Sequence, residues 1–171
     1  MKKTLMALTF MSLAMAGTAQ AEDHSATVDI HASLTNNISK CVFDTEQDTI
    51  NLSSALSEMP NEGYNARTPT KLQYHISNSC DINTFALQLH GFHGSSSDTV
   101  LVNTDESETA ARGVGVGVFD SDLSPISINS VIPIPPTLTG RYINIELVKF
   151  KNQILLPGTI SSSLTIDIVH L

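Results

Sequence analysis

The chain has 171 residues, of which 41% are hydrophobic and 15% charged, and its formal net charge is −8. An acidic balance of this kind argues against a nucleic-acid partner or an anionic membrane surface. There is no Trp, so a core must be built from Val, Ile, Leu and a few Phe and Tyr.

Residues 1–21 have the pattern of a cleavable secretory signal. Lys2 and Lys3 precede an apolar run that ends in the small-residue site Ala19-Gln20-Ala21. The run is shorter than the about 20 apolar residues that a membrane-spanning helix needs, and two acidic residues follow it at once, so we expect no stable membrane insertion. The mature chain is expected to begin at Glu22 and to form one domain.

The mature chain is dominated by alternation of apolar and polar residues, which is the period of a half-buried strand. Short runs of this kind, separated by turn residues, predict an all-β sandwich without a long helix. The expected strands contain residues 26–34, 50–52, 72–76, 85–89, 114–118, 126–128, 143–147 and 164–168. The proline-rich stretch 131–139 is expected to be a sheet edge or a crossover, because proline cannot donate to a β-ladder.

Two cysteines, Cys41 and Cys80, enclose 38 intervening residues. In an exported chain a pair of thiols enters an oxidising compartment, so one disulfide is the expected outcome. A zinc site is the alternative, but the chain lacks the C-x-x-C and C-x-x-H spacings that favour it.

Candidate metal and phosphate sites are weak in this sequence. His90 and His93 are three residues apart, so in a strand they face opposite sides, and we predict no metal site. The acidic loop Asp105–Glu108 lacks the ligand spacing of a calcium loop. The alternating glycines of 113–117 are not followed by a helix, so a close-packed strand is the better interpretation.

Candidate catalytic residues are equally weak. The serine runs 95–97 and 161–163 lack the G-x-S-x-G pattern of a nucleophile elbow. No constellation of a nucleophile, base and orienting acid can be recognised from spacing. We therefore expect no enzymatic activity and no cofactor, and an exported hydrolase has no site to support it.

Several segments resemble, in order, those of the chaperone–usher fimbrial (pilus) subunit family. They are an alternating N-terminal strand at 26–34, the Cys41 to Cys80 spacing that ends in Asn-Ser-Cys-Asp, the glycine–aliphatic–aspartate strand 113–120, and Pro-Gly-Thr ahead of the C-terminal strand 164–171. The chain departs from the family at Ala32, where Gly is usual, at His170, where Tyr is usual, and in segment 143–150. These departures leave the type of subunit open.

The resemblance implies an immunoglobulin-like β-sandwich that is incomplete and is completed by a donor strand from another subunit. Its layout would be a signal peptide at 1–21, a donor-strand extension at 22–35 and a pilin domain at 36–171. The expected donor side chains are Ala26, Val28, Ile30, Ala32 and Leu34. The expected groove beside the C-terminal strand, which would receive a chaperone or a neighbour, involves Leu164, Ile166, Ile168, His170 and Leu171.

The implied function is that of a structural subunit of a fimbria that polymerises by donor-strand exchange and supports cell adhesion. Its partners would be neighbouring pilin subunits, a periplasmic pilus chaperone and an outer-membrane usher, and it would pass through the periplasm to the surface of a Gram-negative bacterium. Two alternatives stay open. Residues 26–34 can be the first strand of a sandwich completed within one chain, and the protein can be a secreted or fimbrial carbohydrate-binding module.

The cysteine pair gives a first prediction. Protein purified from the periplasm should have a mass lower by two hydrogen atoms than the reduced chain, because Cys41 and Cys80 are joined. Intact-mass spectrometry with and without reductant measures this difference. Free thiols on the folded, exported protein would contradict the disulfide.

Overall fold

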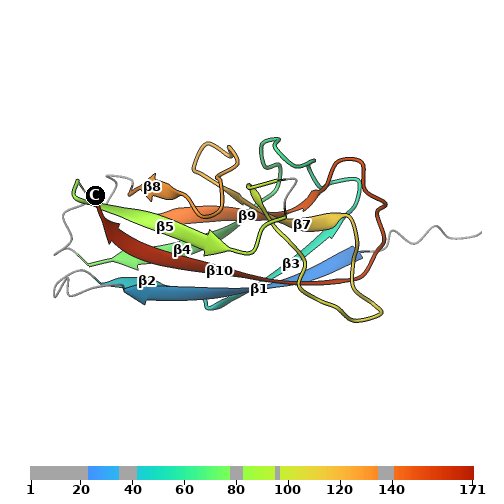
Figure 1. Cartoon of the computed structure of the whole chain (residues 1–171), viewed down its shortest axis with the longest axis horizontal. Helices are drawn as coiled ribbons and strands as arrows, with labels where there is room; N and C mark the ends of the chain where they lie inside the picture. The colour runs from blue at the N-terminus through green and yellow to red at the C-terminus, as the bar shows by residue number, and fades with distance from the viewer. Residues whose placement is uncertain (1–22, 35–41, 78–82, 95–96, 135–140) are drawn as a thin grey trace, which may run out of the picture.

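The computed structural model describes residues 23–34, 42–77, 83–94, 97–134 and 141–171. Every regular element in these ranges is a β-strand, and the strands form two five-stranded sheets in a sandwich-like arrangement (Figure 1). The all-β sandwich predicted from the alternating sequence is therefore observed. Cys41 and Cys80 lie outside the described residues.

The first sheet contains the longest strands of the protein. Its strand order is β3 (Thr49–Ala55), β1 (Asp23–Leu34), β10 (Thr159–His170), β5 (Phe85–Gly91) and β8 (Val131–Pro133). The short β8 forms an edge, as expected for a strand with a proline. The N-terminal and C-terminal strands thus lie side by side near the middle of one sheet.

The second sheet has the order β2 (Phe43–Thr45), β4 (Thr70–Ile76), β9 (Tyr142–Lys149), β7 (Val114–Phe119) and β6 (Val100–Leu101). All of its pairings are antiparallel. The core lies between the two sheets and is filled by the inward side chains of their long strands, including Leu72, Leu87, Val116, Ile145 and Leu164.

Seven of the eight expected strands are present, and one expectation was wrong. Residues 126–128 form no strand, although Ile126 and Ile128 are buried. The segment is irregular, with hydrogen bonds from the Ile126 amide to Val118 and from the Ile128 amide to Asp98. Ile126 and Ile128 stand two residues apart, as buried residues of a strand do, but here they anchor an irregular loop to the core. Three strands of two or three residues, β2, β6 and β8, were too short for periodicity to reveal as strands.

The glycines of β7 are explained by a second apolar cluster on the outer face of its sheet. This cluster contains Ala66, Val100, Phe119, Val148 and Phe150. A Cβ atom added to Gly117 would lie 2.7 Å from the Phe119 ring and 2.8 Å from Val148. Glycine is therefore required where the aromatic ring folds over the strand.

This packing can be tested by Gly117→Ala. The added methyl group should lower the free energy of unfolding by about 1–3 kcal/mol, because it overpacks against Phe119. In a Phe119→Ala background the same substitution should cost less, since the ring is gone and only the contact with Val148 remains. Urea denaturation of the four proteins of this cycle measures the coupling. Equal costs in both backgrounds would show that the ring does not impose the glycine.

Candidate functional site: the seat of the N-terminal strand

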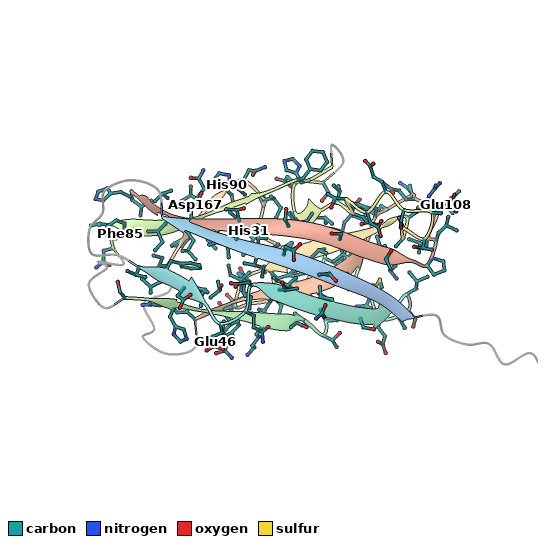
Figure 2. The ribbon with its side chains drawn as sticks, turned by 90° about the horizontal axis from the view of Figure 1, so that it is seen from below. His31, Glu46, Phe85, His90, Glu108 and Asp167 are labelled. Carbon is teal, nitrogen blue, oxygen red and sulfur yellow. The ribbon has the colours of Figure 1, made fainter. Side chains whose placement is uncertain are left out.

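The N-terminal strand β1 is inserted between β3 and β10. It runs antiparallel to β3, with Asp23 to Asp29 opposite Ala55 to Thr49. It runs parallel to β10, with Ser25 opposite Thr159 and Leu34 opposite Ile168. Figure 2 shows β1 in blue lying between these two strands along the length of the sandwich. We call the slot between β3 and β10 the β1 seat.

The inward side chains of β1 are buried in the β1 seat. Ala26, Val28 and Ile30 retain 3%, 0% and 2% of their exposure, whereas the intervening Thr27 and Asp29 are exposed. Burial of Val28 and Ile30 contributes roughly 1.5–3 kcal/mol each before the cost of ordering the strand. Of the five expected donor residues, these three are therefore shown to fill a core position within their own chain.

The remaining two expected donor residues are placed by their backbone. Ala32 lies opposite Ile166 and Leu34 opposite Ile168 in the β10 ladder. Their side chains lie outside the described part of the structure. The register continues the alternation that begins at Ala26.

One wall of the β1 seat is β10. Leu164, Ile166 and Ile168 are fully buried and face the core, as expected. His170 and Leu171 are exposed at the end of the strand instead of lining the seat. The His170 ring meets Phe85 edge-on at 5.3 Å between centroids, and the Leu171 amide donates to the Thr84 carbonyl at 2.8 Å. These last two residues therefore anchor the strand end.

The other wall of the β1 seat is β3, which sequence reasoning did not assign to it. Ile50 and Leu52 are buried and lie opposite Val28 and Ala26. Their alternation marked them as a strand, but period two cannot indicate which strand lies beside them. Only the antiparallel register makes β3 part of the site.

The first residues of β10 are held by the acidic loop at 105–108. Thr159 donates its hydroxyl proton to the Asp105 carboxylate, and the Ser107 amide donates to the same group at 2.8 Å. These hydrogen bonds, that of Thr159 above all, hold the pKa of Asp105 below its usual value of 3.8. The resulting stabilisation of the folded chain is fully present above the usual pKa of 3.8 and is lost as the pH falls through the lowered pKa. The loop thus positions the start of β10.

A buried serine supports the same strand. Ser162 lies on the core side of β10 and donates to the Val102 carbonyl at 2.8 Å. The Ser161 amide donates to the Asn103 side chain at 2.9 Å. The serine run 161–163 is therefore part of β10, and its described contacts are structural.

The histidines are spread over the sandwich. His90 on β5 lies 3.4 Å from Asp167 on β10 (Figure 2). His75 lies 3.0 Å from Glu46. The Nδ1 atom of His93 is hydrogen-bonded to the Gly94 carbonyl oxygen at 3.1 Å. Within the described ranges, no group of three or more His, Cys, Asp or Glu side chains is arranged to hold a metal ion.

A cavity of about 340 Å³ is lined by residues of β4, β8 and β9 and of the loop after β7. Its lining is mostly apolar and includes Ile126, Ile132 and Ile143. Tyr74 also lines it, and burial raises the pKa of this tyrosine to about 12, with Arg141 opposing the rise. The hydroxyl is therefore neutral at ordinary pH. Asp120 and Ser121 also line the cavity, and the Asp120 carboxylate accepts hydrogen bonds from the Asp122 and Ser124 amides.

Comparison with known proteins finds no family model that matches the chain and no curated protein that matches it. In the part of the chain that the structure describes, no helix is long and apolar enough to cross a membrane.

The β1 seat predicts that substitutions at adjacent positions of β1 change the free energy of unfolding by very different amounts. Val28→Asn should lower the free energy of unfolding by about 2–4 kcal/mol, because it removes buried methyl groups and introduces an amide without a partner. Thr27→Asn, on the exposed face, should change it by no more than about 1 kcal/mol. Urea denaturation of the mature chain compares the two. Similar small effects would show that β1 is not part of the core in solution.

Proposed function

We propose that this protein is a structural subunit of a chaperone–usher fimbria and that it polymerises by exchange of its N-terminal strand. The observation that supports this proposal is the position of β1. A strand at the start of the mature chain fills a slot inside a sheet, flanked by β3 on one side and β10 on the other. Such a strand is joined to the rest of the domain at one end only, so the same slot can receive the equivalent strand of another copy.

The chemistry of the β1 seat suits strand addition. Main-chain pairing with β3 and β10 sets the register, and the apolar side chains of Ala26, Val28 and Ile30 fill the core beneath. With β1 absent, the apolar side chains on both walls would face water, and two strand edges would be unpaired. A chain of this kind needs a protecting partner before assembly, which is the role of a periplasmic chaperone, and a platform for exchange, which is the role of an outer-membrane usher.

The other features follow from this proposal. The subunit would leave the cell through the periplasm, join neighbouring subunits in a surface fibre that supports adhesion, and act without a cofactor or catalytic site. Its sandwich would be the incomplete immunoglobulin-like fold, completed in the fibre by a neighbour's strand. In the isolated chain, β1 itself takes that place.

One observation favours a second candidate, a carbohydrate-binding module with a complete sandwich. The structure pairs β1 within its own chain, so the domain has a filled core without a neighbour. The two candidates differ in whether β1 can be replaced. That difference decides the experiment.

The mature chain should be unfolded and refolded with an excess of a labelled peptide of residues 22–35. If the β1 seat accepts a strand from another molecule, the labelled peptide should elute with the folded chain in size-exclusion chromatography. A matched peptide with Val28→Asn and Ile30→Asn should not, because amides would enter the apolar core. If neither peptide is taken up, the result favours the complete sandwich and the binding-module function.

A further inference from the structure

The cavity lined by β4, β8 and β9 has a floor in the core and a mouth at the surface. Tyr74 and Ile143, which line it, are buried, whereas Ser121 and Pro133, which also line it, are exposed. Its volume of about 340 Å³ falls at the lower end of the range of small-molecule sites, roughly 300–1,000 Å³. A small molecule that enters from solvent therefore reaches buried groups of β4 and β9.

Apolar side chains form most of the wall of this cavity. The lining includes four isoleucines, Ile126, Ile132, Ile134 and Ile143. Water finds few hydrogen-bond partners on such a wall, whereas an apolar molecule gains from contact with it. The part of a ligand that fills this space is therefore an aliphatic or aromatic group.

Arg141 brings a positive charge close to the floor of the cavity. Its side chain is only 8% exposed, and its Nε atom has no hydrogen-bond partner. In the described ranges, no Asp or Glu forms an ion pair with it. A buried charge without a partner is costly, and each such group requires an explanation. A negative group at the floor would offset this cost.

The Tyr74 hydroxyl provides a hydrogen-bond donor at the same place. Burial raises the pKa of Tyr74 to about 12, and the charge of Arg141 opposes the rise, so the guanidinium acts on this hydroxyl. The hydroxyl keeps its proton at ordinary pH and can donate it to an anionic oxygen. Tyr74 and Arg141 together thus favour a negative group.

Asp120 is the one carboxylate of the lining described, and it acts in the opposite sense. Its side chain is half-buried and already accepts hydrogen bonds from the Asp122 amide at 2.8 Å and the Ser124 amide at 2.9 Å. Salt screens a charge near water more than a buried one. The buried charge of Arg141 therefore decides the sign at the floor.

We propose that this cavity is a binding site for a small organic anion, a carboxylate attached to an aromatic or branched aliphatic body. The carboxylate lies at the floor, where the Tyr74 hydroxyl donates a hydrogen bond and Arg141 supplies the positive charge. The apolar body fills the space between the isoleucines. The described lining contains no residue of β1, β3 or β10, so this site goes beyond the proposed function and does not depend on strand exchange.

The test is a titration of the mature chain, isotope-labelled at its isoleucine methyl groups, with two probes of the same shape. Cinnamate carries the carboxylate, and cinnamamide carries the same aromatic body with a neutral amide. Both should shift the methyl signals of Ile126, Ile132 and Ile143 in NMR spectra, and cinnamate should bind at least about tenfold tighter. No shift of these signals at millimolar probe would overturn the site. Equal affinities would overturn its preference for an anion.

Two matched variants test the role of Arg141. Arg141→Met keeps an apolar stem and removes the charge, and it should weaken cinnamate binding at least about tenfold while cinnamamide changes by no more than about twofold. Arg112→Met, at an exposed arginine outside the described lining, should leave both affinities unchanged. Equal losses for the two probes in Arg141→Met would show that Arg141 does not select the charge.

A third variant addresses the opposing charge and keeps Arg141 in place, so it decides the proposal even if Arg141→Met does not fold. Asp120→Asn retains an acceptor for the two amides of the turn and removes the carboxylate charge. Cinnamate affinity should stay the same or rise by about threefold. Weaker cinnamate binding in Asp120→Asn, or tighter binding of the cation cinnamylamine than of cinnamate to the wild type, would overturn the assignment to an anion.

Discussion

The constraint on which the structure depends is that β10 needs a strand on each side. Its apolar side chains at Leu164, Ile166 and Ile168 face the core, and β5 covers only one of its edges. The other edge would be open to water and to other chains unless a further strand filled the gap to β3. In the single chain β1 fills it, and the burial of Ala26, Val28 and Ile30 depends on this contact. The core, the sheet order and the proposed exchange all follow from that one slot.

Hydrogen bonds from other parts of the chain hold the strands around this slot in position. Hydrogen bonds from Thr159 to Asp105 and from Ser162 to the Val102 carbonyl tie the first half of β10 to the segment after β6. On the second sheet, the buried Glu146 carboxylate accepts hydrogen bonds from the Arg67 amide at 2.7 Å and the Thr68 amide at 3.1 Å. A buried charge is tolerated when it is bonded in this way. Glu146 thereby fastens the loop after β3 to the second sheet.

The hold on β1 differs along its length. A strand held weakly throughout would leave apolar walls exposed and invite aggregation. The structure has a clamped half at residues 23–29 and a half held mainly by β10 at residues 30–34.

Much of the fold could be predicted from the residues because the side chains on the buried face of a strand occupy every second position of the sequence. The runs at β1, β4, β5, β7, β9 and β10 were recognised in this way, and so was the inward set of Leu164, Ile166 and Ile168. The same rule misassigned residues 126–128, where two buried isoleucines occur in a loop, and it did not indicate Ile50 and Leu52 as a wall of the seat. The sequence by itself determined which side chains of the long strands face the core between the sheets, but not that the other face of β7 and β9 is buried as well. Only the tertiary structure decided which strands lie together, that β1 lies parallel to β10 in its own chain, and that β3 clamps one half of it, because period two specifies a face and contains no information about the neighbour.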